Sequence, residues 1–544
     1  MTEPVAGIKD KIEPPAIKTV NATIEGRPVT VPENTSILEA AKTAGVLIPH
    51  YCYHPSLPVA GVCRMCLVEV EKFPKLAPAC ATTVMEGQVV HVHSQKAKDA
   101  RKGVLEFLLI NHPLDCPICD QAGECELQDY TFAEGRADSR YREPKRFNPM
   151  EDFGGDVLYV QNRCILCTRC VRFMDDVVKE PVLNVSERGD RAYIGKAEGH
   201  DLTNVWAGNV VDLCPVGALL SKDFLNKARA WELDRAPSVC TGCSQGCNIV
   251  VETRDSVAVR LKPRPNEQVN QHFMCEVGRL TYRNFNRRDR ADQPLVRRGN
   301  ALHFADWEVA IASAAALLAD GPLQVIVSPN LSNEALFLLE RIRSARSGRG
   351  VFRVEHGEDV PLPGVRDLAL RSERAANATG ARLLGFSEVP SIASAVVAGD
   401  TLLIVGDDLE GVDAAAIDGA ANIVYVGSSV PDVLVGRAAV VLPIANTLEE
   451  EGTLTNLRGR VQRYLQAKAA PGVARPSWYV LADLLQATGG EARFFLPSEV
   501  FAALAGTHAP FSSLDWDTLG LRGLPVVDNA LTAGAAAPPA GVTR

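Results

Sequence analysis

The chain has 544 residues, which is enough for three or four domains of ordinary size. Its 66 Asp and Glu residues exceed its 57 Lys and Arg residues, and the resulting net charge of −9 argues against a mainly electrostatic nucleic-acid binder. With 46% hydrophobic and 23% charged residues, the composition is that of a folded, soluble protein and excludes a disordered one.

The sequence contains no uninterrupted apolar run of about 18 residues, so we expect no transmembrane helix. Residues 1–18 combine charged residues with prolines and have no apolar centre. We therefore expect a flexible N-terminal segment that is not a secretory signal.

The first ordered segment predicts a β-hairpin followed by a helix. Residues 19–24 and 29–31 favour strands, and they flank Glu25-Gly26-Arg27, which is typical of a turn. Ser36 and Glu39 match the S-x-x-E capping box, so a helix is expected to begin there and to end near Gly45. Because a cysteine-bearing loop follows, this order predicts a small β-grasp domain.

A second helix is predicted over residues 96–110. Its expected apolar side consists of Val104, Phe107, Leu108 and Leu109, and Pro113 ends it.

Two later segments indicate how the chain is divided. Gly154, Gly155 and scattered prolines predict a soft boundary before Val157. Residues 279–298 are basic, and they are expected to form either a solvated linker or a patch that meets an acidic partner.

After Asn300 the pattern changes to alternating strands and helices. The predicted strands are residues 323–327, 401–405, 423–426 and 438–442, and a helix over 333–343 is expected behind the cap residue Ser332. This order favours a mostly parallel sheet with helices on both faces. The tail from Asp528 to Arg544 is expected to be disordered.

All 15 cysteines lie between Cys52 and Cys275, so the second half of the chain contains none. An odd number of cysteines, in a chain expected to lack a signal, disfavours a disulfide framework. The cysteines are therefore expected to form metal sites in the first half.

The first group is Cys52, Cys63, Cys66 and Cys80. Four thiolates on a β-grasp loop that also contains Gly61 are typical of a [2Fe–2S] cluster, and structural zinc remains the alternative.

The second group is Cys116, Cys119 and Cys125, which leaves one ligand position open. His112 lies directly before them and is expected to fill this position. No cysteine group with an open ligand position remains for His50, His54, His91 or His93. A neutral imidazole in place of a thiolate is expected on simple electrostatics to raise a cluster's potential.

The third group has the most specific spacing. Cys164, Cys167 and Cys170 form a C-x2-C-x2-C run, and a remote Cys214-Pro215 completes it. This is the pattern of ferredoxins that bind cubane clusters.

The fourth group consists of four cysteines in a C-x2-C-x3-C-x27-C pattern. Its members are Cys240, Cys243, Cys247 and Cys275. Zinc ribbons also use paired cysteines, so zinc stays open at this group.

No nucleophile–base pair or phosphate-binding glycine motif accompanies these groups, so we expect no catalytic residues on this chain. Several one-electron centres in series are best explained as a conducting chain for electrons, because tunnelling rates fall steeply with distance. The protein is then expected to set the spacing, potential and insulation of the clusters.

Three motifs carry a resemblance to a known family. They are C-R-M-C-L-V-E-V at residues 63–70, N-H-P-L-D-C-P-I-C-D-Q-A-G-E-C at residues 111–125, and N-R-C-I-L-C at residues 162–167 with G-N-V-V-D-L-C-P-V-G-A-L at 208–219. They closely resemble the large iron–sulfur subunit of bacterial respiratory complex I. The resemblance is strong over residues 19–288 and weaker through E-G-T at 451–453 and N-L-R-G-R-V-Q at 456–462.

The resemblance implies one [2Fe–2S] cluster and three [4Fe–4S] clusters. The implied ligands are Cys52, Cys63, Cys66 and Cys80 for the [2Fe–2S] cluster, and for the [4Fe–4S] clusters His112 with Cys116, Cys119 and Cys125, then Cys164, Cys167, Cys170 and Cys214, and then Cys240, Cys243, Cys247 and Cys275. In that family the fourth cluster is optional and lies off the main electron route.

The resemblance also implies a degenerate molybdopterin-oxidoreductase fold in the second half, shortened in this chain. Related enzymes carry a Lys two positions after the last cysteine, where this chain has Val277, and no later cysteine follows. We expect no molybdopterin, although Asp or Ser ligands stay possible.

The resemblance implies a subunit of NADH:quinone oxidoreductase that takes electrons from the NADH-binding flavoprotein subunit and passes them toward quinone. The implied partners are that subunit and other iron–sulfur subunits of the peripheral arm, with an indirect link to the membrane arm and no nucleic acid. The implied location is peripheral, on the cytoplasmic side of the bacterial inner membrane. The alternatives are a subunit of an NAD-linked formate dehydrogenase or of a hydrogenase, and a zinc-binding structural protein.

The fold class expected from both arguments is a multidomain α/β protein. The predicted domains are residues 19–96 ([2Fe–2S] ferredoxin type), 97–136 (a [4Fe–4S] segment with one histidine and three cysteine ligands), 137–232 (ferredoxin-like), 233–289 (molybdopterin-enzyme cluster type) and 290–527 (degenerate molybdopterin-oxidoreductase type), between the terminal segments 1–18 and 528–544.

Overall fold

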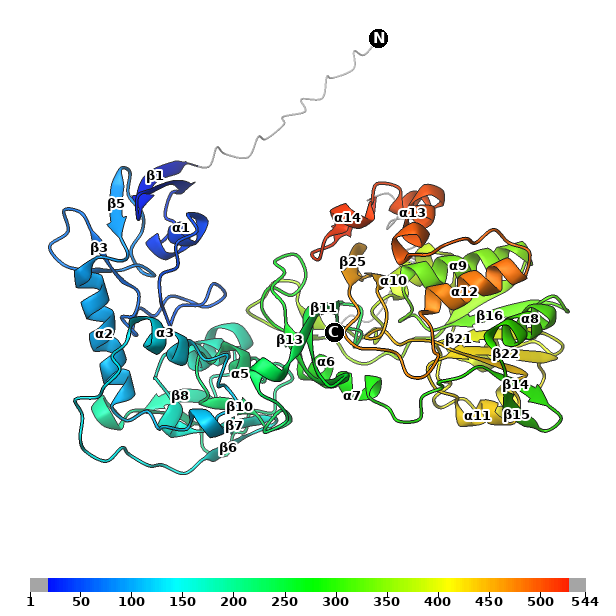
Figure 1. The fold of residues 1–544 in the computed structure, drawn as a ribbon, viewed down its shortest axis with the longest axis horizontal. Helices are drawn as coiled ribbons and strands as arrows, with labels where there is room; N and C mark the ends of the chain where they lie inside the picture. Colours follow the sequence, from blue (N-terminus) through cyan, green and yellow to red (C-terminus); the bar gives the residue numbers. More distant parts are fainter. Residues whose placement is uncertain (1–17, 528–544) are drawn as a thin grey trace, which may run out of the picture.

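The computed structural model describes residues 18–527 and shows a mixed α/β protein with several domains, as predicted. The expected flexible segment 1–18, apart from Lys18, and the expected tail 528–544 lie outside the described residues. Figure 1 shows the cysteine-rich half in blue and cyan and the later α/β half in green, yellow and orange, with the three-stranded sheet that includes β11 and β13, also green, between them.

The N-terminal domain is a five-stranded sheet in the order β2-β1-β5-β3-β4 with one helix. Its elements are β1 (Thr19–Ile24), β2 (Arg27–Pro32), α1 (Ile37–Thr43), β3 (Leu67–Val70), β4 (Ala77–Pro78) and β5 (Gln88–His91). The predicted hairpin is confirmed, with Glu25 and Gly26 both at positive φ in its two-residue turn. The Ser36 hydroxyl accepts the Glu39 N–H at 3.2 Å, as the capping prediction requires.

Helix α2 (Gln95–Leu109) has the predicted length, but the prediction of its apolar side was wrong at Phe107. That side chain is 78% exposed, whereas Ala97, Arg101 and Leu105 are buried. These three residues are four positions apart and so lie on one face, which Arg101 joins because Val92 O and Glu134 satisfy its guanidinium. Because an arginine lies on this buried face of α2, a prediction based on apolar residues alone did not identify it.

The middle of the chain is built from short elements. They are α3 (Glu126–Glu134), β6 (Glu151–Gly154), β7 (Val157–Tyr159), α4 (Arg169–Arg172), a π-helical turn (Phe173–Val178), β8 (Leu183–Ser186), β9 (Tyr193–Lys196), α5 (Asn209–Leu213) and β10 (Leu219–Ser221). Gly154 and Gly155, where the sequence predicts a soft boundary, lie at the turn between β6 and β7 and pack against Asp201 and Leu202. A Cβ on Gly155 would lie 2.3 Å from Leu202 O, so this turn requires glycine.

A three-stranded antiparallel sheet connects the two halves. It comprises β11 (Asp234–Val239), β12 (Asn248–Arg254) and β13 (Val257–Pro263), followed by α6 (Glu276–Leu280) and α7 (Tyr282–Phe285).

The C-terminal half is organised around an eight-stranded sheet in the order β15-β14-β23-β22-β21-β16-β17-β20. Its strands are β14 (Leu295–Arg298), β15 (Ala301–Phe304), β16 (Leu323–Val327), β17 (Arg349–Phe352), β20 (Ser387–Glu388), β21 (Thr401–Val405), β22 (Asn422–Gly427) and β23 (Val440–Pro443). All four predicted strands are present, and the six strands from β23 to β20 run parallel. The remaining strands of this half are β18 (Val360–Pro361), β19 (Ala369–Leu370), β24 (Gly452–Thr455), β25 (Arg460–Tyr464) and β26 (Leu524–Pro525).

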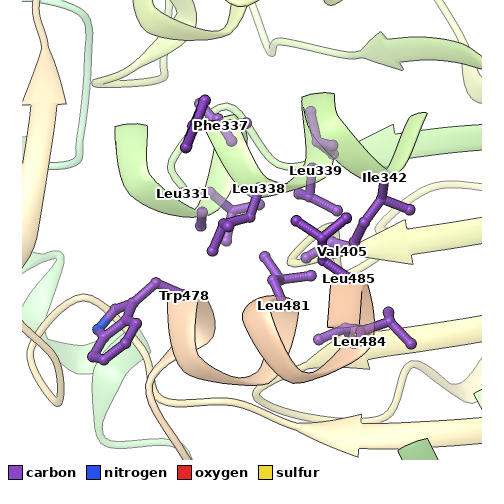
Figure 2. Packing of buried hydrophobic residues seen from close by; sticks show 14 of the residues in the cluster. Leu331, Phe337, Leu338, Leu339, Ile342, Val405, Trp478, Leu481, Leu484 and Leu485 are labelled. Atoms are coloured by element: carbon purple, nitrogen blue, oxygen red, sulfur yellow. The ribbon is translucent and has the colours of Figure 1, made fainter. Parts of the chain in front are cut away.

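The two faces of this sheet are covered differently. One face carries the long helices α8 (Trp307–Leu318), α9 (Asn333–Ala345) and α12 (Ser477–Ala487), and Figure 2 shows Leu338 and Leu339 of α9 facing Leu481 of α12. The opposite face is covered by α11 (Asp432–Val435), short 3-10 turns and loops. The prediction of helices on both faces therefore holds in full only for the first face. The other helices are α10 (Ala378–Leu383), α13 (Pro497–Thr507) and α14 (Trp516–Leu519).

The basic stretch is partly buried. The Arg290 side chain is 8% exposed and pairs with Glu449 at 2.6 Å, and Arg279 pairs with Asp212 on α5. Arg283, Arg287, Arg288 and Arg298 are exposed, as expected for a solvated segment. Removing one partner of a buried pair costs about 3–5 kcal/mol, so Arg279 stabilises the contact between α5 and α6, and Arg290 the contact with the segment around Glu449.

Two buried carboxyls in the C-terminal half are expected to make its stability depend on pH. Burial raises the pKa of Glu334 and of Glu450 to about 7, and for Glu450 the nearby Glu334 adds to the effect. The protonated forms therefore favour the fold: the contribution is complete below about pH 4.5 and is lost as the pH rises through about 7, by on the order of 3 kcal/mol for each carboxyl.

We expect the thermal midpoint of this half to fall between about pH 5 and about pH 8, and Glu334→Gln to reduce that fall. Glu308→Gln, at an exposed position of α8, is the control and should leave the pH dependence unchanged. Calorimetry over this range checks the prediction, and an equal slope in wild type and Glu334→Gln would contradict it.

Between Lys18 and Val527, no helix combines the length and apolarity needed to cross a membrane.

Candidate metal centres

The first site consists of Cys52, Cys63, Cys66 and Cys80, and the structure brings all four together. The thiols of Cys63 and Cys80 interact with that of Cys52 and lower its pKa, and the sulfurs of Cys66 and Cys80 are 3.4 Å apart. The Cys52 N–H donates to Cys63 Sγ at 3.5 Å. Arg64, between two of the cysteines, has a φ of +58°, so the loop adopts a strained backbone to converge on the sulfurs.

The second site consists of His112, Cys116, Cys119 and Cys125, and it surrounds a small cavity. His112 lies beyond the end of α2, and Cys125 is the residue directly before α3. The imidazole Nδ1 of His112 is buried and has no hydrogen-bond partner among the described residues. Burial first, and then the charges of Lys145 and Arg163, lower the pKa of His112 to about 4, so the ring is neutral at pH 7 and able to bind a metal.

Gly217 forms part of the wall of the second site. A Cβ at this position would lie only 2.2 Å from Cys119 Sγ. The residues on either side, Val216 and Ala218, line the third site instead. One short segment therefore separates the two cavities.

The third site consists of Cys164, Cys167, Cys170 and Cys214, which all line one small cavity. Leu166 and Thr168, between the cysteines, have φ values of +51° and +59°. The Leu166 N–H donates to Cys164 Sγ at 3.4 Å, and the backbone at Val216, Leu219 and Ala218 hydrogen-bonds to the Cys214 thiol. Such an arrangement of N–H groups is suited to negatively charged sulfur.

The fourth site consists of Cys240, Cys243, Cys247 and Cys275, all of which are buried. Backbone N–H groups of Gly242 and Gly278 donate to Cys240 Sγ at 3.4 Å and Cys275 Sγ at 3.3 Å. A Cβ on Gly278 would lie 3.1 Å from Cys240 Sγ and 3.5 Å from Cys275 Sγ, so both sulfurs are close to this glycine.

The loop of the fourth site, Ser244-Gln245-Gly246, is held by the C-terminal half. Leu457 N–H donates to Ser244 O at 2.9 Å, Asn456 Nδ2 to Gln245 O at 3.3 Å, and Gln462 Nε2 to Gly246 O at 2.9 Å. The N-L-R-G-R-V-Q motif at residues 456–462 thus has a structural role that its sequence did not reveal.

Burial raises the pKa of the thiols at the third and fourth sites: to about 11 at Cys164, to about 12 at Cys167 and Cys275, and well above the ordinary value at Cys247. These thiols are protonated at neutral pH when no metal is bound. Metal binding must therefore release protons, and it must offset the free-energy cost of burying charged thiolates.

The histidines predicted not to be ligands have other surroundings. His50 Nδ1 lies 2.8 Å from Ile48 O, His54 Nδ1 accepts the Ser56 N–H at 3.2 Å, and His91 pairs with Glu71 at 3.1 Å. Among residues 18–527, no three His, Cys, Asp or Glu side chains converge as they would on a single metal ion.

All four groups meet in one hydrophobic core. This core contains Cys52 of the first site, Cys125 of the second, Cys167 and Cys170 of the third, and all four cysteines of the fourth. Asn209, on α5, bonds through its side chain to the Met274 N–H and carbonyl and so ties the fourth site to the helix that ends just before Cys214. The sequence predicted each group separately, but it contained no sign of the shared core or of the roles of Gly217 and Asn209.

Five family models match the chain in the predicted order. They are the 2Fe-2S iron-sulfur cluster binding domain (residues 17–95), the NADH-ubiquinone oxidoreductase-G iron-sulfur binding region (101–140), the ferredoxin-like domain of NADH-quinone oxidoreductase subunit 3 (154–220), the molybdopterin oxidoreductase Fe4S4 domain (233–287) and molybdopterin oxidoreductase (373–487). The expected series of [2Fe–2S], [4Fe–4S] and molybdopterin-oxidoreductase domains is confirmed.

Similar curated proteins carry consistent names. The NADH-ubiquinone oxidoreductase 78 kDa subunit of Candida albicans is 42% identical over 328 residues, which are 59% of this chain and 45% of that protein. The G subunit of the NADH-quinone oxidoreductase of Rickettsia bellii is 41% identical over 296 residues, which are 54% of this chain and 43% of that protein. The matched part of the chain is homologous to these subunits, and the chain spans less than half the length of the curated relatives it matches.

Among solved structures, a chain of an NAD+-reducing [NiFe]-hydrogenase in the H2-reduced state is 29% identical. The match covers 38% of this chain and 90% of that one, with a TM-score of 0.35, which is too low to support an argument.

Proposed function

We propose that this chain is an electron-transfer subunit of an NADH:quinone oxidoreductase, the respiratory complex I. In this proposal it receives electrons from the NADH-oxidising flavoprotein subunit and passes them toward quinone. It contacts that subunit and other iron–sulfur subunits, on the cytoplasmic side of a bacterial inner membrane, and it completes no active site alone.

The proposal assigns one [2Fe–2S] cluster to the first site and a [4Fe–4S] cluster to each of the others. The proposed ligands are Cys52, Cys63, Cys66 and Cys80; His112, Cys116, Cys119 and Cys125; Cys164, Cys167, Cys170 and Cys214; and Cys240, Cys243, Cys247 and Cys275. The proposed domains are residues 19–96, 97–136, 137–232, 233–289 and 290–527, the last shortened and without molybdopterin.

The observation that carries the proposal is the shared core that joins cysteines of all four sites. The second and third sites surround cavities lined by every one of their predicted ligands. The short segment around Gly217 lines both cavities. Closely spaced centres inside one insulated core suit the transfer of single electrons, whose rate falls steeply with distance.

The donor sets fit the proposed groups. The partnerless Nδ1 of His112 supplies the fourth ligand position that three cysteines leave open. At Gly217 the absence of a side chain leaves the space that a cluster beside Cys119 needs. Cysteine thiolates with backbone N–H donors are the usual surroundings of iron–sulfur clusters.

When bound, iron–sulfur clusters accept and release single electrons, and the chain's own residues set how readily they do so. The backbone N–H groups at Cys164, Cys240 and Cys275 stabilise negative charge on sulfur and so favour reduction. A neutral His112 removes one negative charge from the second site, which acts in the same direction.

The test of this proposal is the metal content of the full chain prepared without oxygen. We expect about 14 iron atoms and an equal number of labile sulfides per chain, with distinct EPR signals for a [2Fe–2S] and for [4Fe–4S] clusters after reduction. A His112→Ala variant is the matched comparison and should lose or alter the signal of the second site only. A colourless protein whose cysteines hold zinc would overturn the proposal.

A further inference from the structure

Arg172, the last residue of α4, connects the first and third sites through a single nitrogen. Its Nη2 donates to the carbonyl oxygen of Cys52 at 2.6 Å and to the carbonyl oxygen of Cys167 at 3.2 Å. Cys52 belongs to the first site and Cys167 to the third. Because an NH2 group carries two hydrogens, both bonds can exist at the same time.

The other nitrogens of Arg172 fix the guanidinium in this position. Nη1 donates to Pro58 O at 2.5 Å, and Nε donates to Thr168 Oγ1 at 3.2 Å. Thr168 directly precedes α4 and belongs to the loop of the third site, whereas Pro58 belongs to the loop of the first. A planar fork held at all three nitrogens is preorganised, so little conformational freedom remains in the bridge.

The positive charge of Arg172 is not paired with a carboxylate of the described chain, in contrast to that of its neighbour Arg169. Arg169, three residues earlier on α4, is paired with Glu126 at 3.3 Å. Every acceptor that the described chain offers to Arg172 is a neutral oxygen. Its Nη2 is held against the backbone of Cys52 and of Cys167, and the thiols that interact with its charge are those of Cys167, Cys52 and Cys170, so the positive charge acts on both sites together.

We propose that Arg172 is the bridging residue between the first and third sites: its guanidinium provides the shortest hydrogen-bonded path from Cys52 to Cys167 and raises the reduction potentials of both centres in common. The path runs from the Cys52 sulfur through its own carbonyl, across Nη2, and back through the Cys167 carbonyl to the Cys167 sulfur. No bond is made or broken, and one electron moves from one centre to the other.

A positive charge shared between two centres has a specific effect. It shifts both potentials in the same direction, so it changes the difference between them, which drives transfer, less than a charge beside one centre alone would. This inference rests on the proposed function, because it requires clusters at both sites.

Two variants separate the charge of Arg172 from its shape. Arg172→Met removes the charge and the bridge, whereas Arg172→Lys keeps the charge but has a single terminal nitrogen that cannot reproduce the planar fork. Arg366→Met is the matched control, because Arg366 is 92% exposed. Each full chain is loaded with iron and sulfide without oxygen, and iron content and EPR spectra are recorded first.

Redox titration followed by EPR gives the potentials, and rapid freezing after partial reduction gives the rate of electron exchange between the first and third centres. In Arg172→Met we expect the potentials of the first and third centres to fall by about 59 mV, which is a tenfold change in the reduced-to-oxidised ratio of a one-electron couple. The potential of the second centre should stay unchanged. In Arg172→Lys we expect wild-type potentials and a slower exchange. Arg366→Met should match wild type in every measurement.

The outcomes distinguish this inference from the proposed function. Unchanged potentials and exchange rates in variants that contain all clusters would overturn the role of Arg172 and leave the proposed function intact. Wild-type protein without iron would overturn the proposed function itself. If Arg172→Met loses a cluster, Arg172→Lys decides: a wild-type exchange rate there refutes the bridge, and a slower one supports it.

Discussion

Replacing Cys214 with alanine is expected to abolish the EPR signal of the third centre and the electron transfer that depends on it. Cys214 follows α5 directly and supplies one of four sulfurs around an enclosed cavity. The backbone at Val216, Leu219 and Ala218 hydrogen-bonds to this thiol, and these contacts are lost with it. A site with three cysteines retains less iron and an altered spectrum.

The measurement combines EPR of the reduced full chain with NADH-to-quinone turnover of the assembled complex. Cys240→Ala is the matched control, because it removes one sulfur from the fourth site by the same substitution. We expect that control to lose the fourth signal and to keep most of the turnover, since the resemblance implies that this cluster lies off the main electron route. Full turnover in an assembled Cys214→Ala complex would contradict the proposed role of the third site.

Replacing Gly217 with alanine is expected to empty the second site. The added methyl group would lie 2.2 Å from Cys119 Sγ and 3.1 Å from the Cβ of Gln121, far inside van der Waals contact. Either the sulfur or the backbone must move, which costs about 1–3 kcal/mol and removes the space for a cluster. We expect the chain to lose about four iron atoms and the signal of the histidine-ligated centre.

The matched control is Gly103→Ala, in the interior of α2. A Cβ at Gly103 meets no atom within 4 Å, so alanine there should leave the iron content unchanged and stabilise the protein by about 0.5–1 kcal/mol. Iron analysis, EPR and thermal unfolding distinguish the two variants. A Gly217→Ala protein with wild-type iron content and spectra would show that the cavity is not the cluster site.

The strands of the C-terminal sheet could be predicted because a parallel sheet buries both of its faces. Residues 323–327 and 401–405 each contain four apolar residues out of five, and β16 and β21 occupy the same residues. The cysteine groups could also be delimited from the sequence, because ligands of one site come largely from a single short loop. Spacing along the chain then reflects proximity in space.

The predictions from the sequence fail where polar residues are buried in the interior. At α2 the buried Arg101 replaces an apolar residue, and Phe107, which the pattern places in the core, is exposed. Between residues 279 and 298, Arg290 looks like a surface residue until Glu449, far along the chain, is placed beside it. The role of Arg172 could not be predicted for the same reason, because its partners are backbone carbonyls, which leave no trace in a sequence.

The contacts of Asn456, Leu457 and Gln462 with the loop Ser244-Gln245-Gly246 have a consequence for biosynthesis. Cys275 leaves the ribosome well before Gln462 does, with a delay on the order of ten seconds or more at usual translation rates. During that interval all residues of the first three sites are already synthesised, but the fourth site still lacks the segment that holds its loop. We therefore expect the fourth site to reach its final shape only after the cysteine-free part of the polypeptide has been made.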